Sequence, residues 1–279
     1  MPHIKRILFP VDFSDSSNGA ARYVEAFAGR FEAEIMLLHA VGMGEHNLAS
    51  ELLPGRQAEL DRFQAEEFSC FTTQRVCVIE DPSTAIARAA QSWRPDLVMM
   101  PTHGLGFFRR HLLGSVTAKA LHDLACPLWT SVHAEAAPPL EKIHCRRILC
   151  ALDLSESSCH VLKWAAWLAG QYQASLGVVH ALPPIDASGE GWYVGEDLAR
   201  QASDQVRTRI EEFLEHEQIR ANQVYVSSGN PAVVAADAAA DLGADLLVIG
   251  RHGNAGFAGD LFQHACAILR ESPCPVVSI

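Results

Sequence analysis

The chain has no long apolar run, no closely paired cysteines and no common catalytic signature. A membrane span needs roughly 18 or more consecutive apolar residues, so we expect no membrane partner. The residues after Met1 run straight into an apolar segment without a cleavage pattern, so we expect no secretory signal. The eight cysteines are scattered without a CxxC spacing, which favours reduced, mostly buried thiols of a cytosolic protein over a disulfide framework.

Two familiar kinds of catalytic loop are also missing. The sequence contains neither a G-x-S-x-G nucleophile elbow nor the lysine of a Walker A loop. Without an evident base or metal-binding carboxylate pair, we expect no catalytic residue and at most slow ATP hydrolysis. A zinc set can be drawn from four residues of the second half, but its spacing fits no standard structural site, so we expect no metal. Those four residues are His252, His264, Cys266 and Cys274.

Positive charge is scarce as well. The chain has 22 Lys and Arg against 33 Asp and Glu, which gives a formal net charge of −11. An acidic protein repels a phosphate backbone at long range, so we expect no nucleic-acid partner. A small phosphate ligand remains compatible with this charge, because a local ring of backbone N–H groups can hold it.

What the chain does contain is one pattern written twice. Residues 5–17 read KRILFPVDFSDSS, and residues 146–158 read RRILCALDLSESS. Asp12 thus pairs with Asp153 at an offset of 141 residues (153 − 12 = 141). Matches at both ends of the halves, in the same order, indicate one fold used twice. Further matches join Ser14 to Ser155, His39 to His180, residues 96–104 to 245–253, and residues 126–128 to 274–276.

A linker separates the two halves. Residues 133–142 read HAEAAPPLEK, whose proline pair, small residues and charges are typical of a connection. We place the boundary near residue 138, which predicts domains over 1–138 and 139–279. Each length suits one ordinary domain.

Within each half, strand-like and helix-like segments alternate, which predicts a parallel sheet with helices on both faces. The first helix follows a serine-rich turn in which Ser14, Ser16 or Ser17 can act as cap, and Gly29 lies near its end. Trp164 and Trp167 are interpreted as core or interdomain packing in preference to ligand stacking. The expected strands of the first half are 7–11, 35–39, 75–79, 97–100 and 128–132, and its later helices are 57–69, 82–90 and 115–124; the second half repeats the pattern, with helices near 162–168 and 198–217.

Ligands of open parallel sheets bind beyond the carboxyl ends of the strands, near the switch in strand order. In the first half this brings together the exits of three strands, among them Asp12. Its carboxylate can hold ribose hydroxyls or an adenine amino group, or it can form a turn with its own backbone. His39 and His180 end strands, where a buried, hydrogen-bonded histidine is expected, and His103 and His252 are expected to orient a loop.

The loop after the fourth strand is the part of the sequence that we expect to bind phosphate. Gly104 is expected to turn the chain with a positive φ, and Gly114-Ser115 opens a helix whose free N–H groups suit an anion. Arg109 and Arg110 either add charge there or form a solvated pair. The turns before Pro82 and Pro231 are interpreted as helix starts, with Gly229-Asn230 a candidate neighbour of a pocket.

These residues resemble the universal stress protein family, which has an aspartate after strand one and a G-x₂-G-x₉-G-(S/T) loop after strand four. The resemblance covers both halves and implies two tandem doubly wound, five-stranded, Rossmann-like α/β domains with strand order 3-2-1-4-5. The family's nucleotide-binding members hold ATP at that loop. Here Pro101 replaces the loop's first glycine and supplies no N–H, while Gly104, Gly114 and Ser115 match.

The second half departs further from the family pattern. Gly250 and Gly253 match the first two glycines, but Phe262-Gln263 or Gln263-His264 stands where Gly-Ser is expected, and Asp260 lies nearby. We therefore expect ATP, with or without Mg²⁺, in the first domain only. The predicted binding residues are Pro10, Val11, Asp12, Ala40, Val41, Pro101, His103, Gly104, Gly114, Ser115 and Val116.

The favoured hypothesis is an adenine-nucleotide-binding, cytoplasmic stress-response regulator with a protein partner of unknown identity. The alternatives are a nucleotide-free interaction scaffold and an ATP-using transferase, the latter lacking a visible catalytic group. The apolar last strands, 128–132 and 276–279, invite edge pairing. The resemblance implies an intramolecular pseudo-dimer of the two halves, with a further homodimer possible.

Overall fold

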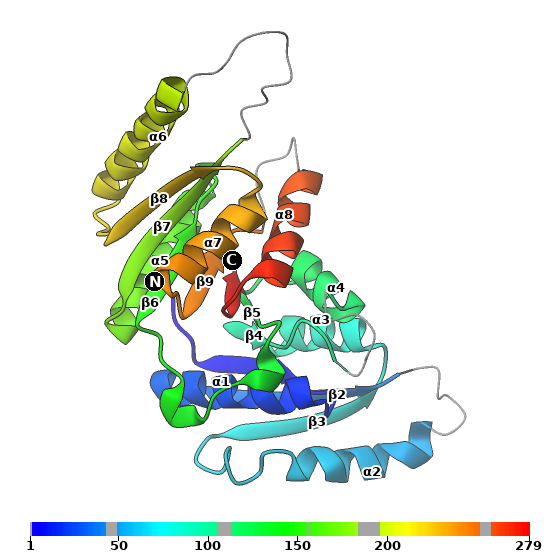
Figure 1. Ribbon diagram of the computed structural model, residues 1–279. Helices are drawn as coiled ribbons and strands as arrows, with labels where there is room; N and C mark the ends of the chain where they lie inside the picture. Colours follow the sequence, from blue (N-terminus) through cyan, green and yellow to red (C-terminus); the bar gives the residue numbers. More distant parts are fainter. Residues whose placement is uncertain (1, 43–48, 105–112, 156, 184–195, 252–257) are drawn as a thin grey trace. The chain divides into compact units, whose positions relative to one another are not determined.

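The computed structural model describes residues 2–42, 49–104, 113–155, 157–183, 196–251 and 258–279. The chain divides into two compact units, residues 1–144 and 145–277. In each unit strands and helices alternate along the chain (Figure 1). The predicted boundary near residue 138 lies between two short 3₁₀ helices, η2 (Ala134–Ala136) and η3 (Leu140–Lys142), and it stays a prediction.

The first unit is built on a sheet in the order β3-β2-β1-β4-β5. Neighbouring strands run parallel, with Ile7 of the central strand paired to Ile35 on one side and Leu97 on the other. Residues of β4 and β5 are buried throughout, which is why these segments are apolar at every position. The strands are β1 (Arg6–Pro10), β2 (Glu34–Val41), β3 (Thr73–Ile79), β4 (Leu97–Met99) and β5 (Leu128–Thr130).

Two helices cover each face of this sheet. The helices α1 (Asp15–Phe31) and α2 (Ala49–Arg62) lie on one face, and α3 (Pro82–Trp93) and α4 (Ser115–Asp123) pack together on the other (Figure 1). Right-handed crossovers produce this division, because the chain winds outward from β1 to β3 and then returns to β4. The switch in direction therefore falls between β1 and β4.

Helix α1 begins at the cap that the serine-rich turn predicts. The Ser14 hydroxyl accepts the N–H of Ser17 at 3.1 Å, so Ser14 is the cap among the three candidates. Gly29 lies near the end of the helix, as predicted, but it is not the C-cap. The helix ends at Phe31, and the C-cap Glu32 adopts a left-handed φ of 51° and donates its N–H to the Ala28 carbonyl.

Helix α2 differs from the predicted segment 57–69. It starts at Ala49, with Pro54 inside it, and ends at Arg62. Two features of the structure end this helix at Arg62. Gln64 has a left-handed φ of 50°, and the Arg75 guanidinium donates to the Phe63 carbonyl at 2.7 Å, which satisfies a carbonyl that a longer helix would use.

The segment after β5 packs on α1. The Arg22 guanidinium donates to the Ala137 carbonyl at 2.5 Å, and Ala134 is buried. Gly19 comes so close to η2 that a Cβ placed on it would lie 1.7 Å from the Ala134 carbonyl oxygen. A glycine in the middle of a helix usually weakens it, and here this close approach is its reason.

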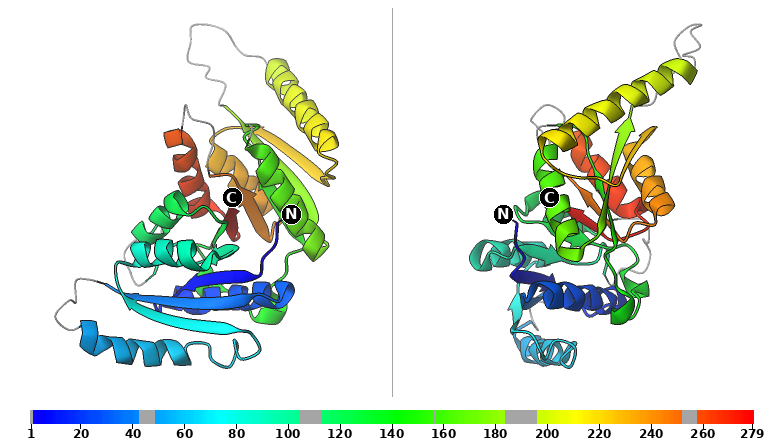
Figure 2. Two further views of the ribbon diagram at one scale, coloured as in Figure 1. Left: turned by 180° about the vertical axis from the view of Figure 1, so that it is seen from behind. Right: turned by 90° about the vertical axis from the view of Figure 1, so that its left-hand side faces the viewer.

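The second unit repeats the arrangement, with strand order β10-β9-β6-β7-β8. Helices α5 and α6 lie on one face, and α7 and α8 pack together on the other (Figure 2). Trp164 is buried in the core, as predicted. The elements are β6 (Arg147–Ala151), α5 (Ser158–Tyr172), β7 (Ser175–Leu182), α6 (Glu196–His216), β8 (Gln223–Ser228), α7 (Pro231–Leu242), β9 (Leu246–Ile249), α8 (Ala258–Glu271) and β10 (Val276–Ser278). The predicted fold class and the order 3-2-1-4-5 are thus confirmed.

Candidate functional site

The first candidate site lies at the carboxyl end of β1. The Val11 N–H still donates to the Leu38 carbonyl of β2 at 2.9 Å, so the chain leaves the sheet only at Asp12. Phe13 then takes a left-handed φ of 62°, which is uncommon for a bulky side chain. This turn aims the chain at Ser14 and the start of α1.

The Asp12 carboxylate holds this turn together. Its Oδ1 atom accepts the Ser14 N–H at 3.0 Å, the Ser14 hydroxyl at 2.5 Å and the Ser17 hydroxyl at 2.6 Å. The Oδ1 atom of Asp12 therefore stabilises the turn, which is one of the two roles that the sequence allows for this carboxylate. The signal was present in the sequence as the repeated D-x-S-x-x-S spacing.

Gly104 packs against the same carboxylate. A Cβ built on Gly104 would lie 1.7 Å from Asp12 Oδ2, closer than any side chain can approach. The expectation of a positive φ at Gly104 is wrong, since the described glycines with positive φ are Gly229 and Gly243. Close approach, and not backbone handedness, is what requires glycine at this position.

Two histidines brace the site. The His39 ring lies with Nδ1 2.8 Å from the Val11 carbonyl oxygen and stacks at 4.5 Å on Phe13. His103 lies beside the Thr102 hydroxyl at 3.1 Å, and its Nε2 is 3.9 Å from Glu135 of η2. Both histidines are hydrogen-bonded, as predicted, but His39 is half-buried and not buried as expected.

We call the start of α4 the phosphate corner, after the role that the sequence predicts for it. Gly114 is the N-cap without a side-chain hydrogen bond, and its own N–H donates to the Thr102 carbonyl at 2.8 Å. The first intrahelical donor is Ala118, so the amides of residues 115–117 have no partner within the helix. Ser115 itself is exposed. This end of α4 therefore presents donors and the positive end of the helix dipole.

Pro101 keeps one useful contact despite its missing N–H. Its carbonyl accepts the Thr117 hydroxyl at 3.2 Å, which ties the loop to the first turn of α4. Arg109 and Arg110, the two candidate cations, lie outside the described residues.

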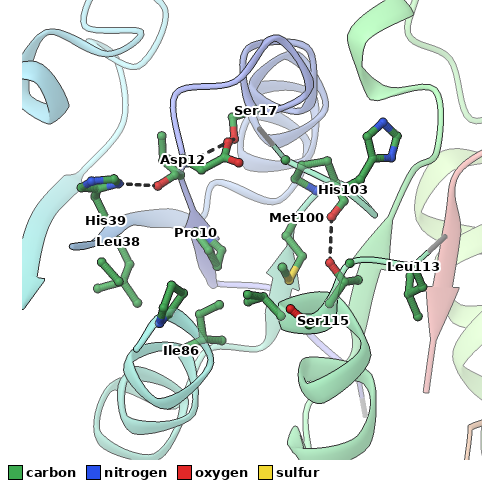
Figure 3. Close-up of a pocket in the computed structure, with 18 residues that line it drawn as sticks. Pro10, Asp12, Ser17, Leu38, His39, Ile86, Met100, His103, Leu113 and Ser115 are labelled. Atoms are coloured by element: carbon green, nitrogen blue, oxygen red, sulfur yellow. Dashed lines mark hydrogen bonds between the residues drawn. The ribbon is translucent and has the colours of Figure 1, made fainter. Parts of the chain in front are cut away.

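A cavity of about 760 Å³ joins these parts. Figure 3 shows Asp12 and Ser115 on opposite sides of it, with Met100 between them. Ten of the eleven predicted binding residues line it, and Val41, which is buried, does not. The sequence interpretation missed the apolar walls from β2, from α3 and from Met100 after β4, because only the fold shows which of these positions face the cavity. The additional lining residues are Ser17, Leu38, His39, Pro82, Ile86, Met100, Leu113 and Thr117.

The second unit repeats the frame of the first. Asp153 Oδ1 accepts the hydroxyls of Ser155 at 2.7 Å and Ser158 at 2.6 Å, and Leu154 has a φ of 59°. Burial alone raises the pKa of Asp153, but the hydrogen bonds from Ser158 and Ser155 outweigh it and hold this pKa below its usual value. His180 Nδ1 lies 2.8 Å from the Leu152 carbonyl oxygen, matching His39.

The two units differ at the phosphate corner. Helix α8 begins at Ala258, so both pairs that can stand in place of Gly114-Ser115, residues 262–263 or 263–264, lie inside a helix and not at its start. Amides inside a helix donate to carbonyls four residues earlier. The side chains of Asp260 and Phe262, and all of His252 and Gly253, lie outside the described residues.

A second cavity of about 410 Å³ occupies the corresponding place in the second unit. Pro231 lines it, as Pro82 lines the first cavity, but Gly229 and Asn230 do not. Asn230 caps α7 by accepting the Ala232 N–H at 2.9 Å, which supports the plain helix-start interpretation.

The remaining chemistry expectations concern cysteines, metals and membranes. Each of the eight cysteines lies outside a disulfide; Cys150 is buried, six are half-buried and Cys70 is exposed. Burial raises the pKa of Cys145 to about 12 and that of Cys274 to about 11. In the described part of the chain no group of three or more His, Cys, Asp or Glu can hold a metal ion. Among the same residues no helix is both long and apolar enough to cross a membrane.

A duplicated doubly wound domain, with a cavity at the switch point of the sheet, has the arrangement in which open α/β proteins bind their ligands. The model of the universal stress protein family matches residues 3–131 and again 144–279. The chain therefore belongs to the universal stress protein family, with two copies of its domain.

Known relatives agree with this assignment. Universal stress protein A homolog 1 of Coxiella burnetii is 29% identical over 140 residues, which cover 49% of this chain and 97% of the relative. A universal stress protein of Methanocaldococcus jannaschii is 31% identical over 137 residues, 44% of this chain and 79% of its own. The crystal structure of a universal stress protein from Archaeoglobus fulgidus has the same fold, with a TM-score of 0.67 at 19% identity, covering 100% of this chain and 97% of that one.

Proposed function

We propose that the first unit binds an adenine nucleotide, ATP with or without Mg²⁺, and that the protein is a cytoplasmic stress-response regulator with at most slow ATP hydrolysis. One observation carries the proposal. The bare start of α4 faces a cavity at the switch point of the sheet, at the loop spacing by which the family holds ATP.

The phosphates are placed at the start of α4. The amides of Ser115 and Val116 and the exposed Ser115 hydroxyl supply donors, and the helix dipole favours an anion there. The net charge of −11 opposes this only weakly, because charges more than about 8–10 Å from the helix start are largely screened at physiological salt. Local donors at hydrogen-bonding distance therefore decide the outcome.

The adenine and ribose are placed across the cavity, toward β1 and β2. Pro10, Ala40 and Ile86 offer apolar surface for a flat ring. Asp12 lies on the same side, where a carboxylate can accept a ribose hydroxyl in a charge-assisted hydrogen bond. Val41 is buried behind this wall, so we expect it to support the wall without contacting the nucleotide.

A nucleotide-free scaffold is the second candidate, and Pro101 favours it. The family loop starts with a glycine whose N–H is absent from proline, so one backbone donor is lost. The scaffold predicts no effect of ATP on the protein's thermal stability.

Isothermal titration of the full chain with ATP and Mg²⁺ tests the proposal, using two matched variants. Ser115→Asp places a carboxylate at the start of α4, which stabilises the helix by about 0.3–1 kcal/mol but repels phosphate. We expect ATP binding to the wild type and at least about tenfold weaker binding to this variant, or 1.4 kcal/mol. Gln263→Asp makes the same change at the matching exposed position inside α8, and it should leave ATP affinity unchanged.

Two results contradict the proposal. No heat of binding with wild-type protein at about 1 mM ATP would favour the scaffold. Equal losses in both variants would mean that net charge, and not the α4 start, controls binding.

A further inference from the structure

The second cavity keeps the polar frame of the first. Asp153 is held by Ser155 and Ser158 in the way that Asp12 is held by Ser14 and Ser17, and His180 repeats the contact of His39 with the strand-end carbonyl. Asp153, Ser158 and His180 all line the cavity. The end of the sheet that would face a sugar and a base in the first unit is therefore present again in the second.

The corner that would receive phosphates is closed to them. The amides of Gln263 and His264 lie more than one turn inside α8, so the helix itself uses them. His264 lines the cavity where the first unit has the open helix start.

The walls of this cavity suit an uncharged guest. Apolar side chains from α5, α7 and α8 face inward, and the volume of about 410 Å³ falls within the range of about 300–1,000 Å³ typical of small-molecule sites. A buried phosphate without partners carries a large desolvation cost, whereas a neutral heteroaromatic ring does not. The apolar lining residues are Leu152, Val161, Val179, Val234, Ala235, Ile249, Ala265 and Ile268.

We propose that the second unit binds an uncharged nucleoside, a flat heteroaromatic base with a hydroxylated sugar, and rejects phosphorylated forms of it. This rests on the proposed function, because the nucleoside assignment follows from the frame that the two units share. Asp153 and His180 are the polar contacts for the sugar and base, and His264 occupies the phosphate side. The one chain thus carries two sites of different charge preference.

Adenosine is the probe, titrated by calorimetry into full-length protein already saturated with ATP. Two alanines at equivalent strand ends make a matched pair, since Ala40 lines the first cavity and Ala181 the second, and both are half-buried. We expect adenosine to bind the wild type, and Ala181→Phe to weaken adenosine at least tenfold while ATP binding is retained. Ala40→Phe should do the reverse.

The outcomes separate the two proposals. Adenosine binding that is lost in Ala40→Phe and kept in Ala181→Phe would overturn the second site, as would AMP binding the ATP-saturated protein as tightly as adenosine. Absence of ATP binding would overturn the proposed function alone, because Ala181→Phe still reports on adenosine. Should that variant unfold, hydrogen exchange of the wild type decides. Adenosine must protect β7 and α7 peptides, and protection confined to β1, β2 and α3 would contradict the inference.

Discussion

Each strand-end aspartate accepts hydrogen bonds from two serines of its own loop, and a left-handed residue follows each one. Phe13 and Leu154 have φ values of 62° and 59°, so both copies hold a non-glycine side chain in a sparsely populated conformation. The serine contacts to Asp12 and Asp153 hold this conformation in place. At this scale, the carboxylates are first of all parts of the turn that positions the cavity wall.

Gly104→Ala tests how closely the loop must approach Asp12. The new Cβ would lie 1.7 Å from Asp12 Oδ2, so either the carboxylate leaves its serines or the loop moves. We expect a loss of about 1–3 kcal/mol in the free energy of unfolding, measured in urea, together with weaker ATP binding. Gly42→Ala is the control, because nothing lies within 4 Å of its Cβ position. Equal stability of the two variants would contradict the close approach.

Ser158→Ala tests the origin of the Asp153 pKa. The serine hydrogen bonds hold this pKa below its unfolded value of about 3.9, so their stabilisation is present above that pH and is lost as the pH falls through the folded pKa. Carbon-13 NMR titration should show a higher Asp153 pKa in the variant, and its destabilisation should shrink in acid. Ser175→Ala removes a hydroxyl that bonds a neutral carbonyl, and its effect should not depend on pH. A pH-independent loss in both variants would refute the charge argument.

At the scale of elements, α1 is fixed from both sides, by the sheet and by the segment after β5. Its buried face follows the helical repeat of small and apolar residues that the sequence displays. The contact between α1 and η2 cannot be predicted from such a repeat, because it depends on one glycine of α1 and on a segment more than a hundred residues away.

Gly19→Ala separates these two influences. Alanine favours a helix over glycine by about 1 kcal/mol, but here its Cβ would lie 1.7 Å from the Ala134 carbonyl oxygen. We expect net destabilisation by about 1–3 kcal/mol in thermal unfolding. Gly170→Ala, in the matching helix α5 with nothing within 4 Å, should instead stabilise. If both substitutions stabilised the protein, η2 would have to move away from α1 at little cost in free energy.

The secondary-structure elements could be predicted wherever the sequence has a clear apolar pattern or a clear helix cap. The apolar runs located β1 and β4, and Asp81-Pro82 located the start of α3, where the Asp81 carboxylate accepts the Ser83 and Thr84 N–H groups. The prediction failed where distant groups decide. The end of α2 depends on Arg75 of β3, and the need for glycine at 104 depends on Asp12. The early start of α8 has no sequence signal that we identify.

At the scale of the whole chain, the two units share a fold but not a phosphate corner. The contrast lies in where the last helix of each unit begins, at Ser115 or at Ala258. Ligand binding to a folded unit stabilises it by about 2.7 kcal/mol at a concentration of 100 Kd. ATP should therefore affect the units unequally.

Hydrogen exchange of the full chain with saturating ATP and Mg²⁺ measures this inequality. We expect slower exchange in peptides of β1, β2 and α4, which border the first cavity, and unchanged exchange in β6, β7 and α8. Ser115→Asp in the same experiment provides the control and should remove the protection. Protection of α8 as strong as that of α4 would show that the second unit also takes the nucleotide.

The early start of α8 also determines how the occupancy of the protein would respond to a change in ATP concentration. If ATP binds only at the start of α4, as proposed, and the chains act independently, occupancy follows a simple hyperbola. Passing from one-tenth to nine-tenths filled then takes about an 80-fold rise in ATP. Such a chain would report gradual shifts of cellular energy state, and it would make a poor all-or-none switch.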